Sequence, residues 1–161
     1  MEAFLKTDRN NSLLAVQRAL LGAVMFPHGA QKLLGWFGGY GFDGTMQFFT
    51  QTLRFPAVLA LLVILAESIG ALLLLAGLGT RLAAFGISAV MLGAILTTHW
   101  KVGFFMNWFG NQAGEGYEFH LLALALAVPL VIAGGGRCAL DSWLSSRLRM
   151  VAGPARAAAL S

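Results

Sequence analysis

Residues 57–78 limit the fold more than any other stretch, because they form an apolar segment with one carboxylate, Glu67, near its middle. As a helix rising about 1.5 Å per residue, this segment is about 33 Å long, which is enough to cross a bilayer. A carboxylate at that depth costs several kcal/mol unless it faces a protein interior and has a partner there. The rest of the chain must therefore supply helices that enclose Glu67.

The composition agrees with a membrane protein, because 58% of the 161 residues are hydrophobic and only 11% are charged. Soluble domains carry about 25% charged residues. Three further segments are long and apolar, at about residues 13–34, 82–98 and 117–133. Together with residues 57–78 they predict four membrane-spanning helices. The expected fold is therefore one all-α membrane domain over residues 1–161, an integral four-helix bundle. Residues 1–8 lack the basic leader and apolar core of a cleavable signal peptide, so none is expected.

Two long loops join the predicted spans. The first loop, residues 35–56, is rich in glycine and aromatic side chains and favours a short surface-lying or re-entrant helix that Asp43 caps. The apolar face of this helix would carry Met46, Phe49 and Leu53. The second loop covers residues 99–116.

The tail from about residue 137 to 151 predicts an amphipathic helix that lies on a membrane surface. Arg147 and Arg149 lie off its apolar side. That apolar side would carry Leu140, Trp143, Leu144, Leu148 and Val151.

The basic residues predict the orientation of the bundle. The start, the turn between the second and third spans, and the tail carry most of them, whereas the long loops and their borders carry only Lys32, Arg54 and Lys101. The positive-inside rule then places both termini in the cytoplasm and both long loops at the outer face. The cytoplasmic set is Lys6, Arg9, Arg18, Arg81, Arg137, Arg147, Arg149 and Arg156.

Small residues and one arginine lead to expectations about packing. Ala66 and Gly70 in the second span, and Gly86, Ala89 and Gly93 in the third, have spacings that allow close contact between helices. For Arg18, about six residues into the first span, snorkelling to the near interface is the simplest interpretation.

Four predicted helices direct polar groups at the outer half of the bundle. All three histidines map to outer helix ends, and Lys32 follows His28 by four residues, so these two share a helix face. The set comprises His28, Lys32, Glu67, His99, Glu118 and His120.

Three interpretations of this polar set stay open. A quinone-like ring needs hydrogen-bond partners, a proton source and apolar walls, which Trp36, Trp108 and Tyr117 would provide. A metal site is disfavoured, because no HxxxH or HxxE spacing is present and Glu118 and His120 lie on different helix faces. The third interpretation is a buried polar network that fixes helix register without turnover.

The cysteine count and the charge exclude other classes. The single cysteine, Cys138, allows neither an internal disulfide nor a Cys-x-x-Cys redox pair nor a cysteine zinc cluster, and haem is not expected without a Cys-x-x-Cys-His motif. The net charge of +4 comes from residues that flank apolar segments, so it indicates topology and no nucleic-acid partner.

A series of motifs extends from about residue 12 to 144. It comprises Arg18, His28-Gly29-x-x-Lys32, Pro56, Glu67-x-x-Gly70, Gly79-Thr80-Arg81, His99, Gly116-Tyr117-Glu118, Gly134 and Asp141. The series resembles the DoxX family of small bacterial membrane proteins. This resemblance implies a four-helix fold and an association with membrane oxidoreductase complexes of oxidative and thiol stress. The family's namesakes resemble the membrane subunit of a thiosulfate:quinone oxidoreductase, which needs a partner subunit. By resemblance, His28, Lys32, Glu67, His99 and Glu118 occupy the family's polar positions.

The combined expectation is a multi-pass protein of the bacterial inner membrane, a subunit or accessory of a quinone-linked oxidoreductase complex. Glu67 and His28 would be catalytic. The ring-binding residues would be Lys32, His99, Glu118, His120, Trp36, Trp108 and Tyr117. The expected partners are the lipid bilayer and a redox protein, and a homo-oligomer stays open. The alternatives are a non-catalytic membrane scaffold for a redox complex and a small-solute or proton pathway.

Overall fold

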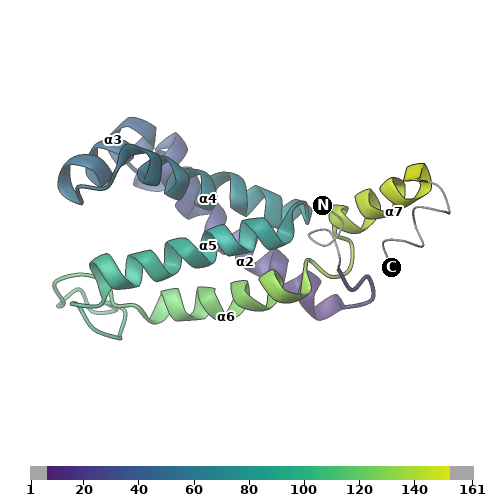
Figure 1. Ribbon diagram of the computed structural model, residues 1–161. Helices are drawn as coiled ribbons and strands as arrows, with labels where there is room; N and C mark the ends of the chain where they lie inside the picture. The colour runs from purple at the N-terminus through teal and green to yellow at the C-terminus, as the bar shows by residue number, and fades with distance from the viewer. Residues whose placement is uncertain (1–6, 153–161) are drawn as a thin grey trace.

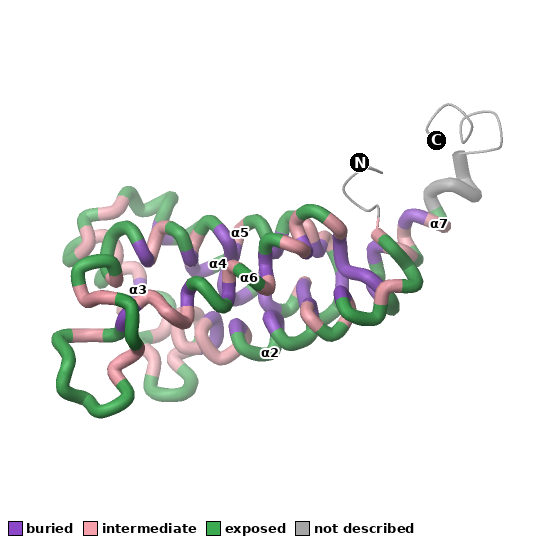
Figure 2. Tube along the Cα trace, turned by 90° about the horizontal axis from the view of Figure 1, so that it is seen from below, coloured by how far each residue is buried: buried purple, intermediate pink, exposed green. Residues whose placement is uncertain are grey.

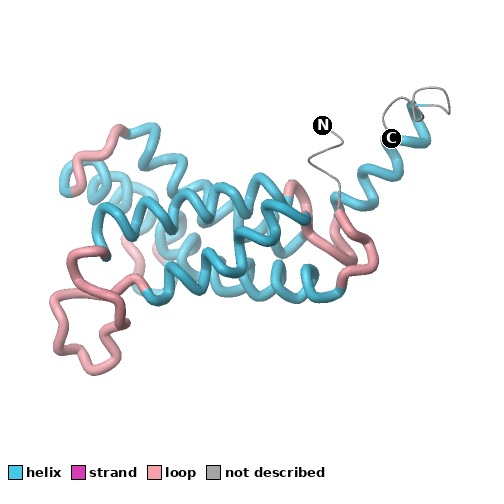
Figure 3. The backbone as a smooth tube through the Cα atoms, turned by 60° about the horizontal axis from the view of Figure 1, so that its bottom comes forward, coloured by secondary structure: helices cyan, strands magenta, loops and turns pink. Residues whose placement is uncertain are grey.

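Four helices form the bundle in the computed structural model, which describes residues 7–152 and their side chains up to residue 147 (Figure 1). These helices are α2 (Ser12–Leu34), α4 (Ala57–Ala76), α5 (Thr80–Ala94) and α6 (Glu118–Ala133). The described part of the chain contains no strand, so the all-α prediction is confirmed (Figure 3). The observed bounds differ from the predicted spans by at most a few residues, apart from the end of α5, which a π-helical turn, η3 (Ile95–His99), extends.

Three of these helices are long and apolar enough to cross a membrane: α2, α4, and α5 together with η3. The fourth, α6, is apolar but has only 16 residues, at the short end for a span. Many large apolar side chains lie exposed on the outer surface of the bundle, while the buried positions follow its inner side (Figure 2). Such a continuous apolar exterior is typical of a helical bundle that lipid surrounds.

Local sequence explains where the helices begin and end. The side chain of Asn11 caps α2 by accepting a hydrogen bond from the Leu14 amide at 3.1 Å, and Gly35 ends the helix with a left-handed φ of 73°. Pro56 precedes α4, and Gly77 ends it with a φ of 69°.

Pro129 lies inside α6 and leaves the Ala125 carbonyl without its helical donor. Gln17 of α2 compensates for this loss, because its side-chain amide donates to the carbonyls of Leu126 at 2.8 Å and Ala125 at 3.4 Å. The helix therefore continues through the proline, and the compensation joins α2 to α6.

Helices α2 and α4 approach each other closely at Gly29 of α2. A Cβ atom there would overlap the backbone of Glu67 and Ser68 in α4, with only 2.5 Å to the Glu67 carbonyl oxygen. Between α4 and α5, a Cβ at Gly86 would lie 3.3 Å from the Cβ of Ala66, as the small-residue pattern predicts. At Gly93, however, an added Cβ atom would have no neighbour within 4 Å, so the predicted close packing at this residue near the end of α5 is wrong.

The two long loops lie together at one end of the bundle, and the chain termini lie at the other (Figure 1). We call these the loop end and the termini end. The first loop contains η1 (Trp36–Gly38), α3 (Gly41–Gln47) and the π-helical turn η2 (Phe48–Thr52). The prediction that both long loops lie at one end is confirmed, while their assignment to the outer side of a membrane stays a prediction.

The short predicted helix exists, but its start differs from the expectation. α3 begins at Gly41, so Asp43 lies exposed within the first turn, and no side chain caps the helix. Asp43 therefore favours the helix through the dipole and not as a cap. Met46, Phe49 and Leu53 are half-buried, in agreement with the predicted apolar face.

At the termini end, Arg18 is buried, with 5% of its surface exposed. Its Nη1 donates to the carbonyls of Leu74 at 2.6 Å and Leu75 at 2.9 Å, and its Nε donates to the Gly135 carbonyl at 3.1 Å. The snorkelling interpretation is therefore wrong, because the carbonyls at the end of α4 provide Arg18 with partners inside the bundle.

The tail forms α7 (Leu140–Ala152), which is tied to the bundle through its first turn. The Asp141 carboxylate accepts from the amides of Gly79 at 2.6 Å and Thr80 at 2.9 Å and so caps the start of α5. Trp143 is exposed beside Arg147, whose guanidinium lies 5.4 Å from the indole centroid, which agrees with an amphipathic helix. Lys6 and Arg156, and the side chains of Leu148, Arg149 and Val151, lie outside the described part of the structure.

Candidate functional site

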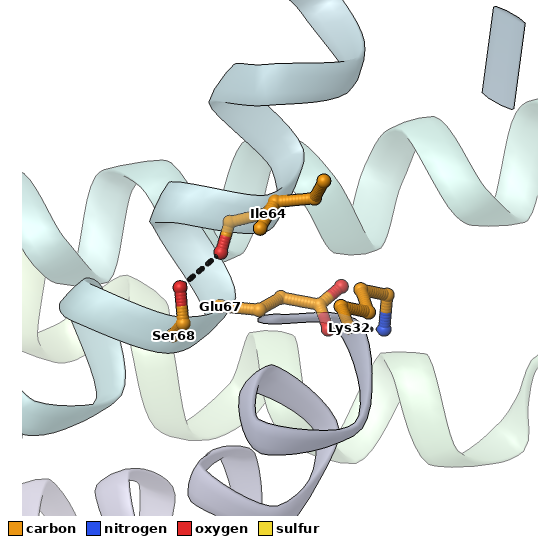
Figure 4. A network of polar contacts seen from close by, with 4 residues as sticks. All are labelled: Lys32, Ile64, Glu67 and Ser68. Carbon is orange, nitrogen blue, oxygen red and sulfur yellow. Dashed lines mark hydrogen bonds and ion pairs between the residues drawn. The ribbon is translucent and has the colours of Figure 1, made fainter. Parts of the chain in front are cut away.

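A buried ion pair joins α2 to α4 in the loop-end half of the bundle. Lys32 Nζ lies 2.5 Å from Glu67 Oε2, and the two side chains are 25% and 5% exposed. Figure 4 shows the Glu67 side chain extending from α4 toward Lys32 on the neighbouring helix. The structure thus identifies the partner that a buried carboxylate requires.

The local sequence explains why this pair forms. Gly29 brings the α2 backbone against that of α4 at Glu67 and Ser68, so a lysine one turn later in α2 reaches the carboxylate. Ser68 does not compete for Glu67, because its hydroxyl donates back to the Ile64 carbonyl at 2.5 Å (Figure 4).

His28 lies half-buried in α2, one turn before Lys32. Its ring packs on Phe119 of α6, with 5.3 Å between the ring centroids. The charges of Glu67 and Lys32 both act on His28. His28 therefore lies between the ion pair and α6.

His120 and His99 form a second histidine contact. Their ring centroids are 4.1 Å apart, and both His99 and His28 act electrostatically on His120. His120 is only 8% exposed, and its Nδ1 atom is buried without a hydrogen-bond partner among the described residues. A buried polar atom of this kind is costly, which favours a functional explanation.

A loop carbonyl orients His99. Its Nδ1 atom lies 2.7 Å from the carbonyl oxygen of Glu115. Because a carbonyl can only accept, Nδ1 carries the proton in this contact, and the neutral ring keeps its lone pair on Nε2.

Two carboxylates hold the second loop in place. Glu118 Oε2 accepts from the Met106 amide at 3.2 Å, and Glu115 Oε2 accepts from the Asn107 amide at 2.7 Å. The loop also closes on the start of α6, where the amides of Tyr117 and Glu118 donate to loop carbonyls. Glu118 thus contacts the loop backbone, and the loop supplies the carbonyl that orients His99.

The predicted aromatic walls are placed unequally. Tyr117 stacks on Trp100 with 5.5 Å between centroids, beside the start of α6. Trp36 and Trp108 are 54% and 78% exposed, so the structure does not enclose them with the histidines. The sequence analysis missed Phe119, whose ring contacts both His28 and His120. Its position directly before His120 is the only signal that could have indicated it.

The structure therefore brings five of the predicted site residues into one connected group, which we call the polar cluster. Its members are His28, Lys32, Glu67, His99 and His120. Within residues 7–152, no group of three or more histidine, cysteine, aspartate or glutamate side chains has an arrangement suited to a metal ion. The cluster combines a cation, a carboxylate and imidazoles, which is a set suited to hydrogen bonding and proton transfer.

The apolar exterior and the buried ion pair define the class of this protein, a helical membrane protein with an ionisable cluster inside its bundle. The profile of the DoxX family matches residues 13–100, more than half of the chain. The chain is also 31% identical over 127 residues to the "Putative oxidoreductase CatD" of Bacillus subtilis (strain 168), an alignment covering 79% of this chain and 83% of that protein. No solved structure matches the chain significantly. The chain belongs to the DoxX family.

Proposed function

We propose that this chain is a multi-pass protein of the bacterial inner membrane that serves as a subunit or accessory of a quinone-linked oxidoreductase complex. It would bind a quinone-like ring at the polar cluster, near the outer face. The name of the CatD relative supports a redox role. The observation that carries the proposal is the Lys32–Glu67 ion pair, buried between two membrane-type helices and next to His28.

The residues present fit the requirements of such a ring. Its two oxygens need donors in the oxidised form and acceptors in the reduced form. Lys32 is a donor, Glu67 is an acceptor, and His120 Nδ1 is a buried polar atom without a partner among the described residues. Phe119 and the apolar side chains of the bundle provide the walls.

A bound quinone would supply a two-electron acceptor, and the residues of this chain would bind it and manage its protons. Lys32, whose side chain is 25% exposed, is placed to donate a hydrogen bond to a ring oxygen. Glu67 would hold or take a proton at its carboxylate, where the low dielectric of the bundle strengthens each polar contact. His28, on which the charges of Lys32 and Glu67 both act, would polarise the ring oxygens.

We propose that the electrons come from a partner protein at the outer face. The chain has a single cysteine, so it contains no dithiol of its own that could exchange two electrons with a thiol substrate. The family resemblance to a two-subunit sulfur-oxidising enzyme supports the same division of labour.

The experiment that tests ring binding is the extraction of detergent-purified protein with organic solvent, followed by quantification of quinone per chain. We expect stoichiometric quinone in the wild type and its loss in Glu67→Gln and His28→Ala. Asp43→Asn is the matched control, because it makes the same acid-to-amide change on an exposed carboxylate of the loop end. Glu67→Gln should also abolish quinone-dependent turnover while the protein stays folded.

Either of two results would contradict ring binding at the cluster: no quinone at any lipid load, or equal quinone content in all four proteins. Both would favour a non-catalytic scaffold, for which the ion pair between α2 and α4 fixes helix register. In that case Glu67→Ala should reduce expression or complex assembly without the loss of any ligand.

A further inference from the structure

We propose that residues 105–110 of the second loop insert into the lipid of the membrane leaflet at the loop end, between its headgroups and its acyl chains. We call these residues the aromatic tip. The proposal goes beyond the proposed function and does not depend on ring binding, because it concerns a surface of the loop and not the polar cluster.

The aromatic tip exposes three large rings together. Phe105, Trp108 and Phe109 are 66%, 78% and 89% exposed. Apolar surface of this kind is costly in water, and a patch of it indicates an interaction site. The tip is also neutral, since residues 102–114 include no Asp, Glu, Lys or Arg. Its partner therefore has to offer apolar contact and not charge.

Two main-chain amides at the tip, and a side chain beside it, are bonded within the loop. The amide of Trp108 donates to the Met106 carbonyl at 2.9 Å. The amide of Gly110 donates to the Asn107 carbonyl at 3.2 Å. The Asn107 side chain accepts from the Gln112 amide at 3.0 Å and donates to the Gln112 carbonyl at 3.4 Å. Because an unpaired polar group is expensive in lipid, this internal bonding allows the tip to leave water.

Contacts with the start of α6 hold the tip in one shape. The carboxylates of Glu118 and Glu115 accept from the consecutive amides of Met106 and Asn107, at 3.2 Å and 2.7 Å. At Gly116 an added Cβ atom would overlap loop carbonyls, so the chain that leaves the loop packs directly on the chain that precedes the tip. A loop held in this way loses little conformational freedom when it inserts, so it keeps most of the gain from apolar contact.

The tip continues the lipid-facing exterior of the bundle. Where the chain enters the loop, Leu96 of η3 and Trp100 are exposed, and where it leaves, Leu121 and Leu122 of α6 are exposed. Figure 3 shows the second loop, the long stretch without helix at the loop end, extending past the flank of the bundle. With the helices crossing the membrane, a loop in this position lies along the membrane surface, where Trp and Tyr side chains are enriched.

These observations favour lipid over a protein as the partner of the tip. A protein interface has a rim of directional hydrogen bonds. The polar groups beside the tip are instead bonded within the loop, as Asn107 and Gln112 are to each other. Lipid needs no directional contact, and it already surrounds the bundle next to the tip. A protein partner and a second copy of this chain are therefore outcomes of the test that would contradict the proposal.

The test places a nitroxide spin label at the tip of the full chain in phosphatidylcholine vesicles. Cys138→Ser removes the single cysteine, so that Phe105→Cys and Phe109→Cys each become a unique labelling site. We expect molecular oxygen to reach both labels more readily than a water-soluble nickel complex, at a depth of about 5–10 Å into the boundary between headgroups and acyl chains. Asp43→Cys is the matched control, because it replaces an exposed carboxylate of the same end, and there the nickel complex should have the better access.

A pair of substitutions tests whether the rings hold the tip in lipid. With the label at Phe105→Cys, Phe109→Asp should move the label toward water, whereas Phe109→Leu, which keeps an apolar side chain, should leave its depth unchanged. Anionic lipid attracts basic segments. Because the tip is neutral, addition of phosphatidylglycerol to the vesicles should not change the depth of the label.

Trp108 provides a measurement on a chain without a label. The fluorescence that is lost in Trp108→Phe belongs to this side chain. Phosphatidylcholine that carries bromine near the glycerol end of its acyl chains should quench that fluorescence, and aqueous iodide should not. This result does not depend on how a spin label affects the loop.

Any of three results would overturn the proposal. Equal access of the nickel complex to the tip labels and to the Asp43→Cys label would place the tip in water, where a protein partner would have to cover it. Dipolar broadening between tip labels would assign the surface to a second copy of the chain. Equal label depth in Phe109→Asp and Phe109→Leu would show that the rings do not hold the tip in lipid.

Discussion

The two ends of the bundle both bury charged residues, but they satisfy them in different ways. At the termini end, Arg18 donates to main-chain carbonyls and Asp141 accepts from main-chain amides. At the loop end, Lys32 and Glu67 bond each other, and the histidines contact rings or a loop carbonyl. Main-chain groups do not titrate, whereas Lys32 and Glu67 are ionisable side chains that are each other's partners. The termini end is therefore built to hold a fixed structure, and the loop end can change its protonation state.

The comparison also holds for buried atoms without hydrogen-bond partners. Among the described side chains, these are Thr80 Oγ1 near the termini end and His120 Nδ1 at the loop end. A hydroxyl in this position costs stability but has no accessible second charge state, whereas an imidazole has both a neutral and a protonated form. A buried atom without a hydrogen-bond partner can therefore contribute acid–base chemistry only at the loop end.

The largest expected effect is at the termini end. Arg18→Ala removes the donor to three main-chain carbonyls and a positive charge that interacts with Asp141, so we expect a loss of about 3 kcal/mol in the free energy of unfolding. Denaturant or thermal unfolding in detergent measures this loss. Arg147→Ala is the control, because its cation–π contact on the surface is worth about 0.5–1 kcal/mol. If the two substitutions cost the same, the termini end is not the structural end.

The next effect is at the contact between α2 and α4, on which the ion pair depends. Gly29→Ala places a methyl group against the backbone of Glu67 and Ser68, so we expect a destabilisation of about 2 kcal/mol together with weaker quinone retention. Gly93→Ala adds the same methyl group where nothing lies within 4 Å, and should stabilise α5 by up to about 1 kcal/mol. Equal effects of the two substitutions would show that close packing at Gly29 is not needed to position Glu67.

The smallest effect on stability should come from removing both charges at the loop end. Because a buried ion pair is often replaced by apolar residues without loss, Lys32→Met with Glu67→Leu should change the free energy of unfolding by no more than about 1 kcal/mol. Ring binding should be lost in the same protein. Unfolding curves and quinone extraction on one preparation test both statements. A loss as large as that of Arg18→Ala would make the loop end structural and remove the difference between the two ends.

Much of the fold could be predicted from the sequence, because long apolar segments indicate which parts of the chain cross the membrane. The four long helices, the loops at one end and the gathering of His28, His99, His120 and Glu67 follow from segment length and alternating direction alone. Helix rotation, however, cannot be read from such apolar segments. The pairing of Lys32 with Glu67 was not predicted for that reason, although the need for a partner was.

The prediction for Arg18 was wrong because of main-chain atoms that only the folded structure brings near. Arg18 was expected to reach the interface, but the carbonyls that end α4 lie close enough to bind it. The contacts of other residues were not predicted for the same reason, since Glu118 binds an amide of the second loop, and Trp36 and Trp108 are exposed. That these three residues contact a bound ring stays a prediction. The positions of loop amides and helix-end carbonyls depend on geometry that residue type does not encode.

The cap that Asp141 provides has a consequence for biosynthesis. The amides at the start of α5 bind the carboxylate of Asp141, which is 61 positions later in the chain than Thr80. Synthesis proceeds from the N-terminus, so the turn between α4 and α5 is made before the residue that caps it. Asp141 emerges after α6, when all four helices of the bundle exist. Its arrival is thus the closing step of assembly, and a nascent chain stalled before residue 141 would present an α5 whose first turn is still open.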